Sequence, residues 1–399
     1  MTVHVDPYQP VRLHELTYLD DGGEITVGRT DIDSYCVLPA DGAAVLRRLE
    51  SGMAPAQAAA WYVATYREPV DIDEFVATLA ELGFLVQPGD EPAKAVRWQR
   101  LGGMVFSRPA AIGYAAVVVA AVVLMIGQPD LAPHYRNLFF TRYMTLLMLG
   151  AFLGQLPLIL LHEAFHALAG RRLGLPSSLS IGRRLYFIVF ETSLDGLVTV
   201  PRRQRYLPML AGMLADSIAV AGLTCAAAVT RHPDGSQPLA GAFCLAIAFG
   251  TTLRIVWQFY FFLQTDLYHV AATALRCNDL QLAARRTLRN RLWRALRRPD
   301  RVLDESTWHA RDRAVARWYS WLLLVGYAAS ITTLILAVIP TAVRVLASVS
   351  RHLVDGAGPG STADSLVFFG LGAAQLAVLV GVAVRERRNR RIEPTRLVD

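Results

Sequence analysis

The chain has 399 residues, of which 53% are hydrophobic, and it carries a formal net charge of +7. Its apolar runs reach the roughly 20 residues that a helix needs to cross a bilayer, which predicts a membrane protein. Arginines in the loops between spans explain the positive charge better than a nucleic-acid partner, so we exclude nucleic-acid binding. The four scattered cysteines include no CxxC pair and predict neither a disulfide framework nor a zinc–thiolate site.

Residues 1–92 are expected to form a small α+β domain. We expect this domain to lie in the cytoplasm, because the polar N-terminal segment has no basic stretch followed by an apolar one and so predicts no cleavable signal peptide. Short strands are expected in "VRLHELTYLDDGGEITVGR" and "YCVLP". Amphipathic helices are expected in "ADGAAVLRRLESG", "APAQAAAWYVATY" and "DIDEFVATLAELGFLV". This order predicts a winged-helix-like unit, followed by a basic linker over 93–109.

A mainly α-helical membrane domain with six spans is expected over 110–399. The predicted spans lie near residues 110–127, 143–170, 207–229, 239–265, 318–346 and 365–384. Arginines are concentrated before the first span, in every second loop and after the last span, whereas loops 128–142, 230–238 and 347–364 are poor in them. The positive-inside tendency then places both termini in the cytoplasm.

A basic cytoplasmic segment is expected at 276–317, between the fourth and fifth spans. Leucines and Trp293 stand among its arginines from Arg285 to Arg298. Two interpretations remain open for this stretch: a helix lying in the membrane interface, or a solvated basic loop.

The second span ends in "LILLHEAFHALAGRRLG", which contains the pattern H-E-x-x-H at His162, Glu163 and His166. Residues four apart on a helix lie about 40° apart in azimuth and roughly 6 Å apart along the axis, so both imidazoles can reach one ion. In zinc hydrolases of this pattern, zinc polarises a water molecule and the glutamate takes its proton. The competing interpretation is two core histidines and a buried glutamate, but ionisable residues inside a span are usually functional.

A catalytic zinc ion needs a third protein ligand, for which Glu191, Asp195, Asp216 and Asp266 are candidates. Asp195 lies in "LYFIVFETSLDGLVTVPRR", which predicts a β-hairpin over 186–200 with Leu-Asp-Gly at its turn. Asp266 ends the fourth span about ten residues before Arg276, hence ~15 Å deep if helical, which matches the depth of the histidines. We therefore expect Asp266 to be the third ligand.

Residues 100–285 resemble the site-2-protease-like intramembrane zinc metalloproteases, in particular the bacterial peptide zinc metalloproteases. The resemblance rests on "HEAFHALAGRRLG", "PRRQRYLPMLAGMLADS" and "FFLQTDLYHV". It implies that Asp266 corresponds to the aspartate of the family's "DG" motif, and that the chain is a multi-pass protein of a bacterial cytoplasmic membrane. Leu267 stands where the family usually has glycine, and Asp216 stands where its "AGPxxN" pattern has asparagine.

Residues 10–88 resemble the PqqD-like peptide-recognition domains. That resemblance implies a leader peptide bound along the strand edge at Tyr35 and Val37, next to the helix over 73–82. Edge-strand pairing gives affinity through main-chain hydrogen bonds and specificity through alternate side chains. The alternative is a structural or regulatory domain that binds no peptide.

These patterns together predict an intramembrane zinc endopeptidase that matures a ribosomally synthesised peptide. Glu163 is the expected base and proton donor, and the predicted hairpin is expected to hold substrate as an added strand at Tyr186 and Val189. Two alternatives remain: a non-proteolytic exporter or immunity component, and a signalling protease that cleaves a transmembrane regulator. Finally, Arg254 and Asp216 interrupt neighbouring spans, and two arrangements are open: the two charges pair, because an unpaired charge at depth is costly, or Arg254 extends to the outer interface of the membrane.

Overall fold

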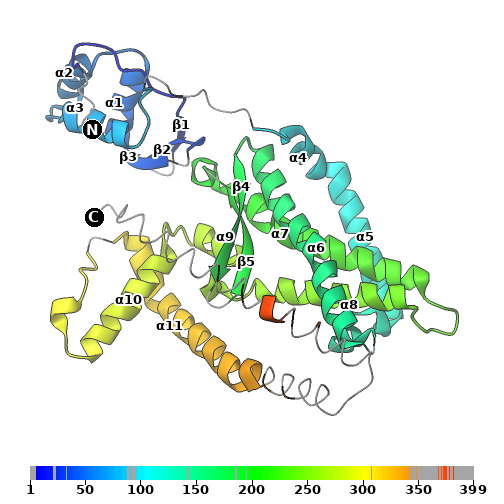
Figure 1. The fold of residues 1–399 in the computed structure, drawn as a ribbon. Helices are drawn as coiled ribbons and strands as arrows, with labels where there is room; N and C mark the ends of the chain where they lie inside the picture. The colour runs from blue at the N-terminus through cyan, green and yellow to red at the C-terminus, as the bar shows by residue number, and fades with distance from the viewer. Residues whose placement is uncertain are drawn as a thin grey trace. The chain divides into compact units, whose positions relative to one another are not determined.

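The computed structural model of the chain is mainly helical, with two small sheets (Figure 1). It describes residues 6–340, apart from 21–23, 33, 88–89, 91–95, 142, 185–186, 195 and 307, together with scattered residues between 343 and 381. The chain divides into two compact units. The first comprises residues 1–107, 166–179 and 192–208, and the second comprises residues 108–165, 180–191 and 209–399.

The first unit begins with three strands followed by three helices, the order expected from the sequence. The strands β1 (Thr17–Asp20), β2 (Glu24–Arg29) and β3 (Ser34–Pro39) form an antiparallel sheet in that order, with Val27 opposite Tyr18 and Cys36. The helices are α1 (Ala40–Glu50), α2 (Pro55–Tyr66) and α3 (Ile72–Glu81). Because β2 is the middle strand, β3 is an edge of this sheet, as the peptide-binding prediction requires.

An apolar core holds this sheet and these helices together. Its fully buried members include one residue of β2, three of α1 at helical spacing and one of α3: Val27, Val45, Leu46, Leu49 and Leu79. Local signals fix the helix starts, since Pro55 occupies the first turn of α2 and the Asp71 carboxylate accepts a hydrogen bond from the Glu74 amide at 2.9 Å.

The first unit also contains the 3₁₀ helix η3 (Leu197–Thr199), which packs on the sheet of β1 to β3. A Cβ atom at Gly28 of β2 would lie 2.8 Å from the Thr199 Cγ2 atom, so only glycine allows η3 to approach this closely. Helix α4 (Gln99–Val105) occupies part of the expected linker and contacts the end of α6 through Gly102.

Five helices in the described part of the chain are long and apolar enough to cross a membrane. They are α5 (Arg108–Gly127), α6 (Met144–Arg172), α7 (Arg202–Thr230), α8 (Leu239–Trp257) and α11 (Ala310–Thr333), which continues into the π-helical turn η6 (Leu334–Val338). They correspond to the first five expected spans and make the chain a multi-pass membrane protein. The sixth expected span, 365–384, lies mostly outside the described residues.

Short helical turns complete the second unit between and after these spans. The 3₁₀ helices η1 (Pro129–Leu131) and η2 (Tyr135–Phe139) follow α5, and η4 (Phe261–Leu263) follows α8. Helices α9 (Asp266–Ala274) and α10 (Leu280–Ala295) and the 3₁₀ helix η5 (Pro299–Arg301) precede α11. The basic segment therefore contains a helix, and the loop interpretation is wrong for residues 280–295.

Helices α6 and α8 pack closely because glycines face larger side chains across their contact. A Cβ atom at Gly154 of α6 would collide with the side chain of Ile247 on α8, and one at Gly250 of α8 would collide with Gln155 on α6. Small residues drive helix association in membranes because they let backbones approach, where no hydrophobic effect acts between helices. The contact brings Gln155 against α8, where its amide donates to the Ile247 carbonyl at 2.8 Å.

Two sequence-based boundaries are wrong. The β-hairpin is formed by β4 (Ser177–Arg184) and β5 (Phe187–Leu194), not by residues 186–200, because Gly196 at φ +74° leads into η3 instead of reversing the chain between two strands. The fourth span ends at Trp257 and not at 265, so Asp266 begins α9. Hydrogen bonds across the break hold this geometry: Thr265 donates to the Gln258 carbonyl, and the Asp266 amide donates to the Gln258 side chain.

Candidate metal centre

Helix α6 carries His162, Glu163 and His166, and all three side chains are buried. The helix forms here because an apolar run precedes the motif and alanines and leucines follow it, with Arg171 and Arg172 in the last turn near the negative end of the helix dipole. One continuous helix fixes the separation of the two imidazoles, which lie about one turn apart on one face.

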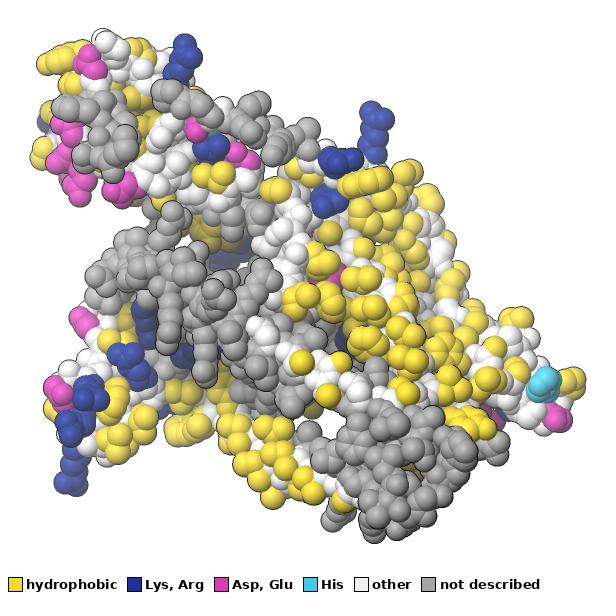
Figure 2. All heavy atoms as spheres, in the orientation of Figure 1, with side chains coloured by type: hydrophobic (Ala, Val, Ile, Leu, Met, Phe, Trp, Pro, Cys, Tyr) yellow, Lys and Arg dark blue, Asp and Glu magenta, His cyan; other side chains and the backbone are white. Residues whose placement is uncertain are grey.

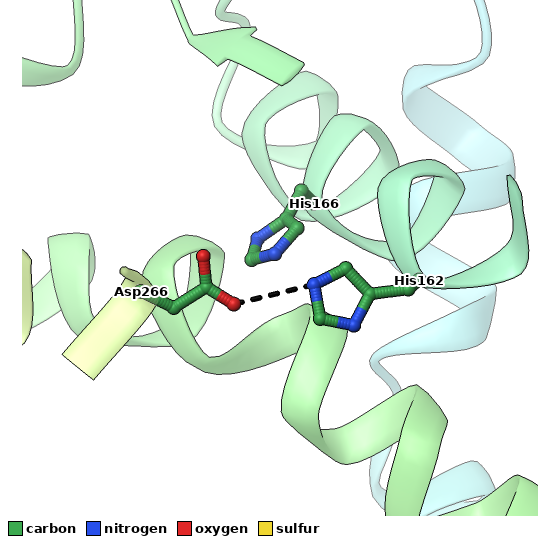
Figure 3. A group of neighbouring side chains, drawn as sticks. All are labelled: His162, His166 and Asp266. Carbon is green, nitrogen blue, oxygen red and sulfur yellow. Dashed lines mark ion pairs between the residues drawn. The ribbon is translucent and has the colours of Figure 1, made fainter. Parts of the chain in front are cut away.

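Asp266 meets these histidines from the start of α9, and Figure 3 shows the three side chains pointing toward one another. One ligand atom from each residue lies within 4.8 Å of the other two. The Asp266 Oδ2 atom lies 3.2 Å from the His162 Nε2 atom. The structure therefore brings together the three residues that the sequence selected as ligands, although Asp266 comes from a different element than the sequence indicated.

The remaining ring nitrogen of each histidine is held by a hydrogen bond to α7. The His166 Nδ1 atom lies 2.7 Å from the Pro208 carbonyl oxygen, and the His162 Nδ1 atom lies 3.0 Å from Asp216 Oδ2. Both partners are acceptors, so each imidazole donates from its Nδ1 atom, and its Nε2 atom is the one left to face the cluster. Such second partners orient metal-binding histidines and increase their basicity.

Asp216 is 1% exposed and is held by a guanidinium group as well as by His162. Arg254 of α8 forms a bidentate pair with the Asp216 carboxylate, through its Nε and Nη2 atoms. The third nitrogen, Nη1, donates to the Gln155 side-chain oxygen at 3.1 Å. The predicted pairing of Arg254 with Asp216 is confirmed, and it compensates a charge whose burial alone would cost several kcal/mol.

The donor set fits zinc. Two imidazole nitrogens and one carboxylate oxygen are the commonest ligands of a three-residue catalytic zinc site, which keeps a fourth position open. The ligand atoms of a tetrahedral zinc ion lie roughly 3.3 Å apart, and the ligand atoms of the three side chains lie within 4.8 Å of one another. His162, His166 and Asp266 would hold the ion, while Asp216 and Pro208 would act through the histidines.

The other ligand candidates take different positions. Asp216 contacts the opposite nitrogen of His162 from the one that faces the cluster, which removes it from the ligand set. Glu191 lies in β5, where its backbone carbonyl accepts a hydrogen bond from Ser180, and Asp195 lies outside the described residues.

The candidate substrate-binding residues are placed only in part. Tyr35 and Val37 lie on the edge strand β3 with exposed side chains on one face. Val189 lies in β5, whereas Tyr186 lies outside the described residues.

Sequence reasoning missed Gln155 and the Pro208 carbonyl. A signal for Gln155 existed, because it interrupts an apolar run seven residues before His162 and so lies on the same face of α6. No side-chain pattern marks a backbone carbonyl as a partner of His166, so that contact required the fold.

Comparison of the chain with protein-family models, with curated proteins and with solved structures gives no match.

Proposed function

We propose that the protein is an intramembrane zinc endopeptidase that cleaves a peptide or a membrane-associated substrate near the cytoplasmic face. The observation that carries this proposal is the meeting of His162, His166 and Asp266 between apolar helices, with both Nδ1 atoms already hydrogen-bonded. Purely structural histidines have no need of a third, acidic partner aimed at their Nε2 atoms. The glutamate beside the first histidine adds the group that peptide hydrolysis needs.

The chain's own residues supply positioning and proton transfer. When bound, zinc supplies Lewis acidity, which polarises the scissile carbonyl and lowers the pKa of water. The Glu163 carboxylate takes the proton from the attacking water and then donates it to the amine nitrogen of the leaving peptide. Asp216 and Pro208 hold the imidazole rings in place, and the surrounding apolar helices limit access of bulk water.

The edge strand β3 supports a role of the N-terminal residues in peptide capture. Tyr35 and Val37 have exposed side chains on one face of the strand, and β3 is an outer strand of this sheet among the described strands, which is the position where a peptide strand could be added. In this proposal residues 1–92 hold a leader peptide of a ribosomally synthesised precursor while the membrane site cuts it. Strand β5, through Val189, is the second candidate surface for an extended substrate.

Glu163→Gln tests the proposal. The full-length protein is purified in detergent, its zinc is measured by elemental analysis, and cleavage of a proteome-derived peptide library is followed by mass spectrometry. Wild type is expected to carry about one zinc per chain and to cleave, whereas Glu163→Gln keeps zinc and loses turnover, because Glu163 is the base and not a ligand.

Glu68→Gln is the matched control, since Glu68 is an exposed residue outside the proposed site. It should leave both zinc content and cleavage unchanged. Wild type without zinc, or Glu163→Gln that cleaves as fast as wild type, would contradict the proposal.

A further inference from the structure

Helix α10 has an unusual distribution of side chains: apart from Leu280 its buried residues are small or polar, and Leu282 and Leu292 are exposed. Its buried residues include Ala283, Ala284, Thr287 and Asn290. The Asn290 side chain is satisfied inside, since it donates to the Leu303 carbonyl at 2.9 Å and accepts from the Leu303 amide. A helix on the surface of a water-soluble protein has the opposite arrangement.

The outward face of α10 and its C-cap residue Leu296 form a stripe of three leucines and two arginines. Leu282, Arg285, Arg289, Leu292 and Leu296 follow one another at intervals of three and four residues and lie within about 80° of arc. All five are exposed, with the leucines at 38%, 54% and 56%. Figure 2 shows dark-blue and yellow side chains interleaved at the lower left, where Figure 1 places α10.

The charge of this helix has one sign. Residues 280–298 contain seven arginines and no aspartate or glutamate: Arg285, Arg286, Arg289, Arg291, Arg294, Arg297 and Arg298. Arg291 is committed to α11, where it donates to the Ser320 hydroxyl and lies over the ring of Trp321. Arg285 of the stripe also donates to the Tyr327 hydroxyl of α11, at 3.3 Å, while its side chain stays exposed. Arg289 is exposed too, and α10 contains no acidic residue.

The neighbouring helix α11 marks the level of the membrane surface. Helix α11 is one of the candidate spans and packs along α10. Near its start Trp318 and Trp321 are 53% and 55% exposed, and exposed tryptophans at the end of a span are typical of the interface between headgroups and acyl chains. Arg291 of α10 lies over the Trp321 ring, which places α10 beside this part of α11.

We propose that the outward face of α10, together with Trp318 and Trp321, is a binding surface for anionic phospholipid headgroups. Leucines enter the acyl boundary while the long arginine side chains extend to the phosphates. Positive charge next to a span attracts anionic lipids of the cytoplasmic leaflet, so this surface selects phosphatidylglycerol over zwitterionic lipid. The proposal is independent of the metal centre, since no residue of that centre lies on α10.

The depth of the α10 face in the bilayer is tested with the fluorophore bimane, attached to a cysteine at Leu292→Cys. The labelled full-length protein is placed in liposomes of phosphatidylglycerol and phosphatidylcholine. Acyl-chain-brominated phosphatidylcholine is expected to remove roughly half of the bimane emission, and a label at Gln57→Cys, in the N-terminal helix α2, should keep its emission. Labelling of the protein without the added cysteine gives the background from native cysteines. Leu296→Cys is the second site if Leu292→Cys folds poorly.

Headgroup selectivity is tested by thermal unfolding in mixed micelles. Phosphatidylglycerol is expected to raise the unfolding midpoint more than phosphatidylcholine does, and high salt should reduce the difference. The triple change Arg285→Gln, Arg286→Gln, Arg289→Gln should abolish it, whereas the charge-matched change Arg12→Gln, Arg48→Gln, Arg67→Gln should retain it. Emission at Leu292 that equals the Gln57 control, or equal effects of the two lipids on wild type, would overturn the proposal.

Discussion

The N-terminal core and the membrane helices differ in which kinds of side chain they bury. The core under β1 to β3 is a cluster of apolar residues, among them Val27, Leu46 and Leu79, and Arg29 is the one charged residue buried among the described residues of this region. Helix α5 exposes Val119, Val123 and Ile126, while Asp216 is buried deep against α6 and α8. In water the hydrophobic effect sorts side chains, whereas in a bilayer the cost of an unpaired polar group does.

The difference teaches where single substitutions should be most damaging. A buried apolar residue contributes through area and packing, so its loss leaves a cavity of limited cost. A buried charge contributes through its partners, so its loss leaves another charge uncompensated. The membrane region should therefore respond to changes in pairs of residues, and the N-terminal region to changes in side-chain volume.

The largest effect is expected at the proposed metal ligands. Asp266→Ala removes one of three protein ligands and should lower zinc content from about one per chain toward zero after dialysis against a mild chelator. Asp130→Ala, which removes a surface carboxylate paired with Arg231, is the control and should retain zinc. Elemental analysis with unchanged zinc in Asp266→Ala would show that Asp266 is not a ligand.

Asp216→Ala should have the next largest effect, because it leaves the partly buried guanidinium of Arg254 without its carboxylate partner. We expect a loss of about 3–5 kcal/mol in the free energy of unfolding. The double change Asp216→Ala, Arg254→Leu should be less damaging than the sum of its single changes, since it removes both charges. Unfolding in detergent measures all three variants, and strictly additive losses would mean that the two residues do not stabilise each other.

Leu46→Ala probes the apolar core for comparison. Leu46 is fully buried under the sheet, so its truncation should cost about 2–5 kcal/mol in the stability of residues 6–87. Faster amide hydrogen exchange confined to α1, α2 and α3 in the full-length protein would report this loss. The exposed neighbour Arg47→Ala should leave exchange nearly unchanged, and an equal effect there would argue against core packing as the cause.

The smallest effect is expected from a charge at the surface of the N-terminal region. The Tyr62 hydroxyl donates to Asp41 at 2.6 Å, which holds the pKa of Asp41 below its usual range and contributes to raising the pKa of Tyr62 to about 12. Because the pKa of Asp41 is lowered in the fold, the stabilisation is present above its ordinary value and is lost as pH falls through the folded value. Tyr62→Phe should therefore reduce the acid sensitivity of hydrogen exchange in α1 between about pH 2 and pH 4.

Much of the architecture could be predicted from the sequence, because it depends on hydrophobic periodicity and on the spacing of residues. Apolar runs predicted five described spans, and alternating patterns predicted the strands and helices of residues 17–81. The spacing of four residues predicted that the two histidines lie on one helix face. The cost of burying a charge predicted the pairing of Arg254 with Asp216.

Features that depend on tertiary contacts could not be predicted from the sequence. The helix break after Trp257 is not marked by proline or glycine, because "WQFYFFLQTD" contains neither. The hydrogen bonds of Gln258 that hold the break form only in the folded protein. Strand β4 is mostly polar, with Leu179 and Ile181 as its only apolar residues, so the sequence-based hairpin was placed about one strand too late. The role of Asp216 as the partner of His162 depended on the approach of α7 to α6.

The break between α8 and α9 also has a consequence for the order of events during synthesis. His166 and Asp266 are separated by 100 residues, and two spans, α7 and α8, are made between them. At about 5–20 residues per second, the ribosome needs roughly 5–20 s to pass from one to the other. Throughout that interval the nascent chain presents two histidines without their acidic partner, so a site that needs all three residues cannot act on the translocation machinery or on its own emerging helices.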